Sequence, residues 1–399
     1  MSIVIIGGGQ AAGAAIRKLR ELGHAGQVVL VSDESHLPYE RPPLSKEYLW
    51  RIEQDLRCIA PGRQSNERML LDSSATSIDP NAKTVTCANG TVLPYEALLL
   101  ATGGRPRRLS IPGSDLANVH CLRTALDAGA LRRSLDHCAA KGQALLVVGG
   151  SWIGLEVAAG AREAGIEVVL LERGDRLCSR TLPTADAEWM QSLHTSRGVA
   201  IRLRTTLERL EGSCLAEHAH LSDGSRLKVG AVIAGIGIAP NVELAHQCGV
   251  HVRNGVVIDR HGRTSISGIY AAGDVAEQTC AWHGESVRIE TWDNANRQGE
   301  AAAAHIAGVA GEGPASVPWF WSDQYGINLQ VVGSPLKGNT VISSQSDGPQ
   351  RLSIHLRGGA VVGAVGINRA RDMRRLRKLL GEQALLDEAA LQQHGFSSH

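Results

Sequence analysis

The fold is decided at Ile3-Val4-Ile5-Ile6-Gly7-Gly8-Gly9-Gln10-Ala11-Ala12-Gly13, where a β-branched run meets a glycine cluster. The cluster reads G-x-G-x-x-A, with Gly7, Gly9 and Ala12 at the three key positions. The first glycine permits a tight turn, the second lets backbone N–H groups approach a pyrophosphate, and the third position needs a small side chain for close helix–strand packing. The positive end of the helix dipole adds to the attraction. The stretch therefore predicts the opening of a dinucleotide-binding fold.

The following residues complete a βαβ unit. A helix is expected through about Leu22, and the apolar strand Val28–Val31 leads into Asp33-Glu34. About 20 residues after the glycines, an acid is expected to hold the adenosine ribose hydroxyls. Asp33 is the first candidate for this role and Glu34 is the second.

A second unit repeats the pattern. Its strand Ala144–Val148 leads into Gly149-Gly150-Ser151-Trp152-Ile153-Gly154, a helix through about Ala164, the strand Val168–Leu171 and the acid Glu172. Ser151 replaces the middle glycine, so its side chain either crowds a pyrophosphate or hydrogen-bonds to it. A carboxylate at Glu172 accepts from the 2′-OH of NAD and repels the 2′-phosphate of NADP, although Arg173 next to it weakens that selectivity.

Two dinucleotide sites in one chain predict two cofactors, FAD and NADH, with hydride transfer between them. Hydrophobic residues make up 43% of the 399, and the formal net charge of +1 gives no global attraction to nucleic acid. No stretch approaches the roughly 18 apolar residues of a membrane span, and the first six residues, Met1 to Ile6, lead straight into the glycine cluster without the pattern of a signal peptide. A cytoplasmic location is therefore expected. The eight Cys contain no C-x-x-C pair and no metal-ligand spacing, so no metal site is predicted.

The C-terminal part follows a different pattern. From about residue 316 it contains Trp319, Trp321 and Tyr325, four alternating apolar and polar runs typical of strands, and a basic helix from about Ala370 to Leu380. This pattern indicates a separate α+β domain.

A resemblance to two-dinucleotide-domain flavoproteins rests on five further stretches. Their "ATG" strand is similar to Leu98-Leu99-Leu100-Ala101-Thr102-Gly103-Gly104-Arg105-Pro106, and their second FAD motif is similar to the stretch from Thr264 to Val275 that contains Gly273-Asp274. Three stretches narrow the match, and they are Leu37-Pro38-Tyr39-Glu40-Arg41-Pro42-Pro43-Leu44-Ser45-Lys46, Ile289-Glu290-Thr291-Trp292-Asp293-Asn294-Ala295 and Pro318-Trp319-Phe320-Trp321-Ser322-Asp323-Gln324. Along nearly its whole length the chain resembles the NADH:ferredoxin reductases of aromatic-ring dioxygenase systems, and putidaredoxin and rubredoxin reductases.

The resemblance implies an α/β fold with two Rossmann-like dinucleotide-binding domains, similar to glutathione reductase, plus a C-terminal α+β domain. The implied FAD domain is discontinuous, at residues 1–109 and 235–315. The NAD domain is expected at residues 110–234 and the C-terminal domain at 316–399. The implied activity is transfer of electrons from NADH through FAD to a 2Fe–2S ferredoxin that feeds an oxygenase.

The resemblance and the glycine motifs together assign site residues. Those expected at FAD are Gly7, Gly9, Ala11, Ala12, Asp33, Glu34, Arg41, Lys46, Ala75, Ala101, Thr102, Gly103, Arg123, Gly273, Asp274, Trp292 and Trp319. Those expected at the nicotinamide nucleotide are Gly149, Ser151, Ile153, Gly154, Glu156, Glu172, Gly235, Ile236 and Gly237.

Three of these assignments keep an alternative. Lys46 is implied to lie near the flavin and to pair with Glu156, either as a catalytic pair or as a pair that only closes a domain interface. Trp319 and Trp321 lie either beside the flavin or in the core. The basic helix is either a solvated face or a docking patch for an acidic ferredoxin, and its cationic residues are Arg371, Arg374, Arg375, Arg377 and Lys378.

Other enzymes with such a fold need particular residues, whose presence can be checked in the sequence. Disulfide reductases need a cysteine pair beside the flavin, and NADH peroxidases and coenzyme A disulfide reductases need one reactive cysteine early in the chain. The corresponding region, Ser35 to Glu40, contains no Cys, and Cys58 lies too far along. Two alternatives remain open, a redox-responsive NADH-binding protein similar to apoptosis-inducing factor and an NADH oxidase.

Overall fold

A computed structural model describes residues 1–50, 55–280, 282, 284–309, 317–345, 350–382 and 386–396. The chain forms two compact units. The first contains Met1–Arg41, Asp55–Arg105 and Ala239–Pro318. The second contains Pro42–Gln54, Pro106–Ile238 and Trp319–His399. The chain passes between the units within β8 (Gly104–Pro106) and β17 (Ile238–Pro240).

A five-stranded parallel sheet forms the centre of the first unit, in the order β19-β7-β1-β2-β3. Its strands are β1 (Ile3–Ile6), β2 (Val28–Val31), β3 (Glu67–Leu70), β7 (Ala97–Leu100) and β19 (Ile269–Ala271). The four residues of β1 form a strand because all are β-branched, and all four are buried. Burial on both faces is expected for a parallel sheet that other elements cover.

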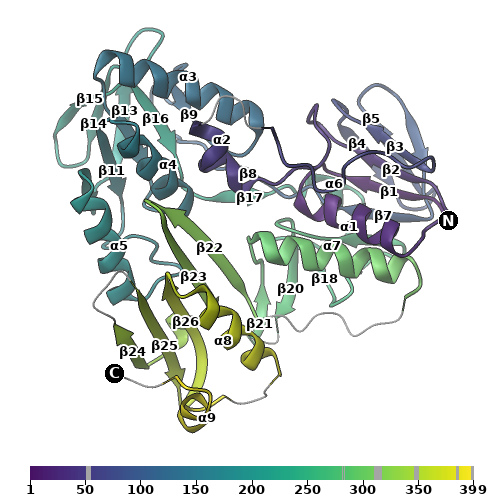
Figure 1. Ribbon diagram of the computed structural model, residues 1–399. Helices are drawn as coiled ribbons and strands as arrows, with labels where there is room; N and C mark the ends of the chain where they lie inside the picture. Colours follow the sequence, from purple (N-terminus) through teal and green to yellow (C-terminus); the bar gives the residue numbers. More distant parts are fainter. Residues whose placement is uncertain are drawn as a thin grey trace. The chain divides into compact units, whose positions relative to one another are not determined.

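Two helices cover one face of this sheet, α1 (Gln10–Glu21) and α7 (Trp292–Ile306), and Figure 1 shows them side by side. Small residues allow the close approach, because a Cβ at Gly299 would lie 2.3 Å from the carbonyl oxygen of Ala11. Residues of two small sheets pack on the other face. The remaining elements of this unit are β4 (Ala75–Asp79), β5 (Thr84–Cys87), β6 (Val92–Pro94), α6 (Glu243–Gln247), β18 (Val256–Ile258), β20 (Ala276–Cys280) and β21 (Glu285–Val287).

The second unit contains another parallel sheet, in the order β12-β11-β10-β16-β9. Its strands are β9 (Val119–His120), β10 (Leu145–Val148), β11 (Val168–Glu172), β12 (Val199–Leu203) and β16 (Ala231–Ala234). Its helices are α3 (Ala125–Lys141), α4 (Trp152–Glu163) and α5 (Thr184–Ser196). A three-stranded sheet of β13 (Leu207–Glu211), β14 (His218–Leu221) and β15 (Arg226–Lys228) packs against it.

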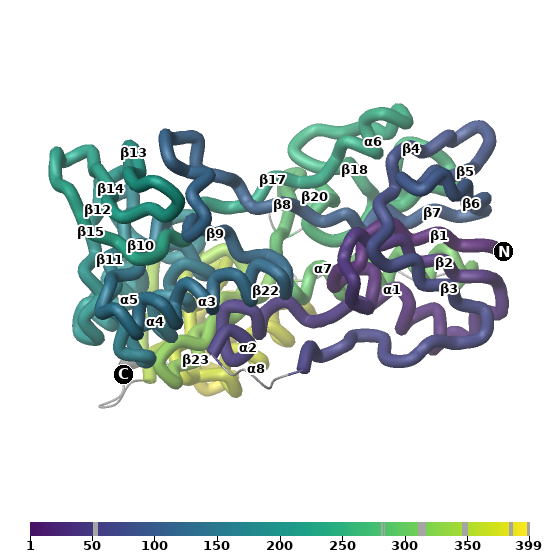
Figure 2. The backbone as a smooth tube through the Cα atoms, turned by 90° about the horizontal axis from the view of Figure 1, so that it is seen from above, coloured from purple at the N-terminus to yellow at the C-terminus, as the bar shows by residue number. Residues whose placement is uncertain are grey.

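A short segment from the N-terminal part also belongs to the second unit. The 3₁₀ turn η1 (Pro42–Ser45) and α2 (Glu47–Trp50) lie next to α3 and α4, as Figure 2 shows. Arg132 on α3 donates to the carbonyl oxygen of Leu49 at 2.7 Å. This placement brings Lys46 to α4, which is more than 100 residues away in the sequence.

The C-terminal part is an antiparallel sheet in the order β22-β23-β26-β25-β24, together with a basic helix, α8. The bounds are β22 (Trp319–Gln324), β23 (Ile327–Gly333), η2 (Pro335–Lys337), β24 (Thr340–Gln345), β25 (Arg351–Arg357), β26 (Ala360–Ile367), α8 (Ala370–Glu382) and α9 (Glu388–Gln393). Met373, Leu376, Leu379 and Leu380 form the buried stripe of α8, which leaves its cations on the other faces.

Two parallel α/β sheets and a C-terminal α+β part confirm the predicted fold class. The predicted boundaries near residues 109 and 235 stay predictions, and the one between 315 and 316 lies outside the described residues. Among the described residues, no helix combines the length and apolar character that a membrane crossing requires.

Candidate functional site

The first glycine turn leaves no room for a side chain at Gly7. Gly7 has φ of +107°, and a Cβ there would lie 2.2 Å from the carbonyl oxygen of Ala101. The N–H of Gly7 donates to the carbonyl oxygen of Val31 at 2.8 Å, which fixes the turn above β2. The predicted residues Ala101 and Thr102 therefore lie directly against Gly7, and Gly103 follows them in the chain. A side chain at Gly7 would force this contact apart.

The start of α1 suits an anion. Gly9 is the N-cap and supplies no side-chain hydrogen bond, and the first turn contains no acidic residue. The first N–H groups of the helix therefore remain available to a ligand. The guanidinium of Arg41 lies 3.7 Å from the position of a Cβ on Gly9, so a positive charge stands beside this turn. Backbone donors and a cation at one helix start fit the pyrophosphate of a dinucleotide.

This geometry does not decide which acid after β2 binds the adenosine ribose. Gly7 and Gly149 make the same bond, to the carbonyl oxygens of Val31 and Leu171 respectively, so the position that matches Glu172 is Ser32. The first candidate, Asp33, is exposed. The second, Glu34, forms an ion pair with Arg41 at 2.6 Å and accepts from the hydroxyl of Tyr39. The role of either acid stays a prediction.

The remaining predicted FAD residues are distributed over both units. Gly273 has φ of +84°, a Cβ there would lie 3.1 Å from Cβ of Ala11, and its N–H donates to Gln298 at 2.8 Å. Asp274 follows it, Ala12 is buried in α1, Trp292 begins α7, and Ala75 begins β4, all within the first unit. Lys46, Arg123 and Trp319 belong to the second unit.

The second glycine turn repeats the first. Gly149 has φ of +104°, and a Cβ there would lie 2.6 Å from the carbonyl oxygen of Gly235. A Cβ on Gly154 would lie 2.5 Å from the carbonyl oxygen of Gly149. The hydroxyl of Ser151 donates to the carbonyl oxygen of Gly235 at 2.6 Å. Its side chain therefore fastens the turn to the end of β16, and α4 again begins without an acidic residue in its first turn.

The carboxylate of Glu172 holds this turn by two hydrogen bonds to the backbone. One carboxylate oxygen accepts from the N–H of Gly150 at 2.8 Å, and the other accepts from the N–H of Gly174 at 2.7 Å. Two charge-assisted bonds to backbone fix both oxygens of the carboxylate. Each oxygen keeps capacity for a further donor, which is what a ribose diol would supply. The neighbouring Arg173 is exposed.

Two large apolar side chains beside the same turn are exposed to solvent. Ile153 is 40% exposed and Ile236 is 39% exposed, whereas the strands on either side are buried. Gly237 follows with φ of +97°, so the backbone there also needs glycine. An apolar surface next to uncapped helix N–H groups fits a ligand that combines a flat ring with a pyrophosphate.

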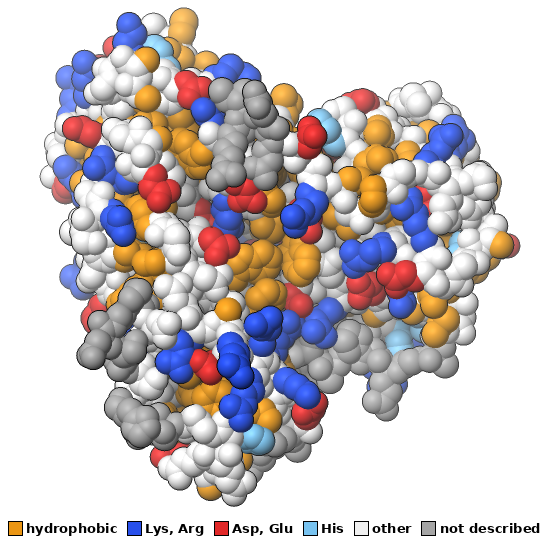
Figure 3. All heavy atoms as spheres, viewed as in Figure 1, with side chains coloured by type: hydrophobic (Ala, Val, Ile, Leu, Met, Phe, Trp, Pro, Cys, Tyr) orange, Lys and Arg blue, Asp and Glu red, His pale blue; other side chains and the backbone are white. Residues whose placement is uncertain are grey.

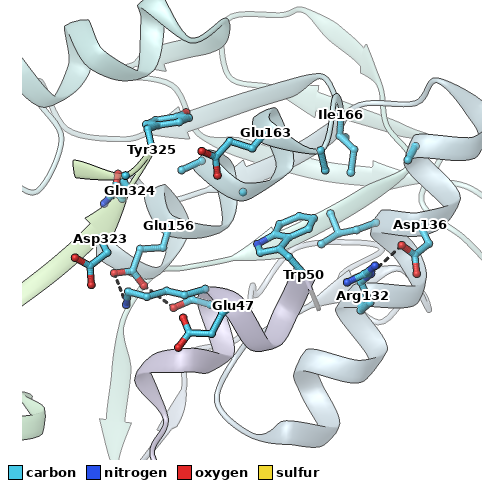
Figure 4. Close-up of a pocket in the computed structure, with 18 residues that line it drawn as sticks. Glu47, Trp50, Arg132, Asp136, Glu156, Glu163, Ile166, Asp323, Gln324 and Tyr325 are labelled. Carbon is cyan, nitrogen blue, oxygen red and sulfur yellow. Dashed lines mark hydrogen bonds and ion pairs between the residues drawn. The ribbon is translucent and has the colours of Figure 1, made fainter. Parts of the chain in front are cut away.

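Lys46 and Glu156 form the predicted pair. The ammonium nitrogen lies 2.9 Å from Oε1 of Glu156, and the two side chains are 14% and 6% exposed. They border a cavity of about 680 Å³ in the second unit, which Figure 4 shows with Glu156, Gln324 and Tyr325 on its wall. The pairing is present in the structure, and its catalytic role stays a prediction.

Two serines at this pair were not singled out from the sequence. Ser45 donates to Oε2 of Glu156, and Ser322 donates to Oε1 at 2.6 Å. The alternation along β22 contained a signal for Ser322, because it lies on the strand face opposite to Trp321. The sequence offered no comparable signal for Ser45, whose partner is 111 residues away.

Trp319 and Trp321 stack with ring centroids 5.1 Å apart. Arg377 on α8 lies over the Trp319 ring at 5.2 Å, and the indole N–H of Trp319 donates to Gln330 at 3.0 Å. Both rings are partly exposed. Trp319 therefore links β22 to the basic helix, Trp321 stacks on it, and neither is a fully buried core residue.

Comparison with known proteins places this geometry in a family. A sequence model described as pyridine nucleotide-disulphide oxidoreductase matches residues 1–299, and one described as reductase C-terminal matches residues 319–397. The chain belongs to the pyridine nucleotide-disulphide oxidoreductase family. This confirms the resemblance found in the sequence.

Within this family, relatives match along nearly the whole chain. Rhodocoxin reductase of Rhodococcus erythropolis is 37% identical, over 98% of this chain and 92% of its own length. The ferredoxin–NAD(+) reductase component of the p-cumate 2,3-dioxygenase system of Pseudomonas putida is 36% identical, over 98% and 95%. The solved covalent complex of putidaredoxin reductase with putidaredoxin matches with a TM-score of 0.90 and 34% identity, over 98% of this chain and 95% of that chain.

Proposed function

We propose that this protein is a cytoplasmic flavoprotein reductase that takes two electrons from NADH through FAD and passes them singly to a 2Fe–2S ferredoxin, which feeds an oxygenase. The observation that carries the proposal is the pair of matching glycine turns, one in each unit, in a chain whose full-length relatives are reductases of small electron-transfer proteins. The eight cysteines include no C-x-x-C or C-x-x-x-x-C pair of the kind that disulfide reductases use.

The chain's own residues bind and orient the two cofactors. Gly7, Gly9 and the start of α1 hold the FAD pyrophosphate, with Arg41 as the adjacent cation. Gly149 and the start of α4 hold the NADH pyrophosphate, and Glu172 accepts from the adenosine ribose. When bound, FAD supplies the conversion between a two-electron donor and a one-electron acceptor. The protein contributes position and exclusion of side reactions.

Lys46 and Glu156 are the proposed catalytic pair. Glu156 lies on α4 four residues after Trp152, so it follows the start of the helix on which the nucleotide is proposed to bind. Its carboxylate holds the Lys46 ammonium, and both side chains are largely buried. The ammonium is thereby a fixed positive charge for the reacting rings, and such charges act strongly where water is excluded.

The docking surface for the ferredoxin is proposed on α8. Arg371, Arg374, Arg375 and Lys378 are exposed, and Figure 3 shows basic side chains gathered over this helix. The stacked Trp319 and Trp321 border it through Arg377. A basic surface beside partly exposed aromatic rings suits a transient complex with an acidic protein, because complementary charge speeds encounter.

The test is a stopped-flow experiment on the purified yellow protein. Mixing with NADH is expected to bleach the flavin rapidly and mixing with NADPH slowly, and added 2Fe–2S ferredoxin is expected to reoxidise it quickly. Slow reoxidation by every ferredoxin tried would favour a redox-responsive NADH-binding protein instead. Rapid oxygen consumption without ferredoxin would favour an NADH oxidase.

A further inference from the structure

The carboxylate of Glu156 is the end point of a chain of buried hydrogen bonds. Ser322 on β22 donates to it at 2.6 Å, and the side-chain amide of Gln324 donates to Ser322 at 2.8 Å. The other end of the amide meets Nε2 of His194 on α5 at 2.6 Å, and Nδ1 of His194 meets the hydroxyl of Tyr325 at 3.2 Å. The chain links two helices of the nucleotide-binding sheet to the first strand of the C-terminal sheet.

Three of the four residues that lead to Glu156 are among the most deeply buried polar groups of the second unit. Ser322 is 1% exposed, Gln324 is 4% and His194 is 0%. Breaking one bond would leave a buried partner without solvation, and such a loss costs about 1–3 kcal/mol. A chain whose members are all satisfied is correspondingly rigid.

The direction of every bond follows from the carboxylate. Glu156 is paired with Lys46 and can only accept, so Ser322 must donate to it. The Ser322 oxygen then accepts from the amide N–H of Gln324, which turns the amide oxygen toward His194. His194 must donate from Nε2, and its Nδ1 is left to accept from Tyr325. Burial lowers the pKa of His194 to about 4, which agrees with a neutral ring in this position.

The far end of the chain is held by an unusual turn. Tyr325 and Gly326 join β22 to β23 with φ of +54° and +70°, a two-residue turn in which Asn-Gly is the preferred sequence. A bulky residue with positive φ is rare and costs about 1 kcal/mol or more. At this position Tyr325 brings its hydroxyl to His194, and its ring packs edge-on against the imidazole at 5.1 Å.

We propose that Ser322, Gln324, His194 and Tyr325 are positioning residues that fix the Glu156 carboxylate, and through it the Lys46 ammonium, for electron uptake from NADH. The proposal rests on the proposed function of the Lys46–Glu156 pair. This series of hydrogen bonds fixes the position of the carboxylate. It does not conduct protons, because the amide of Gln324 interrupts any proton relay. Ser45 holds the second oxygen of Glu156 from the other side, so both carboxylate oxygens have a fixed donor.

Ser322→Ala tests the proposal against a matched control. Ser353 on β25 is also 1% exposed, and its hydroxyl also donates to a buried carboxylate, Asp186, at 3.1 Å. Ser322→Ala removes the donor to Glu156 and the acceptor for Gln324, whereas Ser353→Ala removes the donor to Asp186 in the same C-terminal sheet. The measurement is single-turnover bleaching of the flavin by NADH, together with the NADH dissociation constant and Tm.

We expect both variants to have a lower Tm, and Ser322→Ala the lower of the two, because it also leaves the buried amide N–H of Gln324 without its acceptor. Ser322→Ala is expected to slow the limiting rate of flavin reduction about tenfold with NADH affinity changed less than twofold, whereas Ser353→Ala keeps the rate. The effect should decrease along the chain, from Ser322→Ala to Gln324→Leu to Tyr325→Phe. In a Glu156→Gln background, Ser322→Ala should have no further effect on the rate.

An unchanged rate in Ser322→Ala, or an equal loss in Ser353→Ala, overturns the proposal. A further loss from Ser322→Ala in the Glu156→Gln background also overturns it, because the serine would then act independently of Glu156. The readout does not involve ferredoxin. A wild-type protein that is bleached by NADH but fails to reduce ferredoxin therefore contradicts the proposed partner and leaves this inference intact.

Discussion

At the scale of single residues, Glu172 combines two tasks that the sequence pattern does not separate. Its carboxylate fixes the backbone N–H groups of Gly150 and Gly174, and it is the proposed acceptor for the adenosine ribose of NADH. We expect Glu172→Ala to weaken NADH binding about tenfold or more, because hydrogen bonds to charged groups contribute about 1.5–3 kcal/mol each. The preference for NADH over NADPH should shrink as well, since the repulsion of a 2′-phosphate is removed.

Titration with both nucleotides checks this prediction. Asp175→Ala is the matched control, because Asp175 is an exposed acid on the same loop and its ion pair with Arg176 is at the surface. The control should bind both nucleotides as the wild type does. An unchanged NADH-to-NADPH ratio in Glu172→Ala would contradict the assigned selectivity.

His194 is expected to make stability depend on pH. Burial lowers its pKa to about 4, whereas an unfolded histidine titrates near 6.5. Between these values the unfolded chain binds a proton that the folded chain does not, so stability is full above about pH 6.5 and decreases toward pH 4. The loss from this residue amounts to about 3 kcal/mol.

Urea unfolding at several pH values between 7.5 and 4.5 measures this effect. His194→Gln can still donate toward Gln324 and accept from Tyr325, and it should flatten the acid side of the curve. His137→Gln, at an exposed position on α3, should leave the curve as in the wild type. Equal curves for all three proteins would show that His194 does not set the acid limb.

At the scale of elements, the glycine turns show why a backbone conformation carries function. Gly149→Ala must accept φ of +104° and a Cβ that lies 2.6 Å from a carbonyl oxygen. Gly142→Ala is the control: its φ is +59°, and no atom lies within 4 Å of the new Cβ. It therefore shares the left-handed backbone strain of Gly149→Ala but not the steric clash. We expect Gly142→Ala to cost about 1 kcal/mol and to retain NADH binding. Gly149→Ala should lose NADH binding, as measured by titration with Tm as the companion value.

The same turns show how far sequence reasoning extended. Both βαβ units and the C-terminal strands could be predicted, because periodicity and glycine spacing are local properties of the chain. The Ser45–Glu156–Ser322 contact could not, since its members are joined only when three distant segments pack together. The acid at the end of β2 shows a second limit. Motif spacing pointed to Asp33, whereas matching the two glycine turns by their hydrogen bonds puts Ser32 at the position of Glu172.

At the scale of the whole molecule, charge distribution matters more than total charge. The formal net charge is only +1, so the chain as a whole exerts little attraction on an acidic partner. Attraction must come from a local surface, and α8 supplies one with Arg371, Arg374, Arg375 and Lys378 exposed. Such attraction extends over about 10 Å at 0.1 M salt and weakens as ionic strength rises. Ferredoxin reduction is therefore expected to slow with added salt.

Arg371→Glu combined with Arg374→Glu tests whether that surface is α8. Arg371 lies in the first turn of the helix, where an acid is favoured by the helix dipole, so the double variant should fold normally. We expect the KM for an acidic 2Fe–2S ferredoxin to rise about tenfold at low salt and the salt dependence to become shallower. Reduction of ferricyanide by NADH should be unchanged, because it needs no docking surface. Lys228→Glu, at an exposed position on β15, reverses a charge elsewhere and should leave the KM unaltered. An equal rise in KM for Lys228→Glu would mean that general charge, and not α8, attracts the partner.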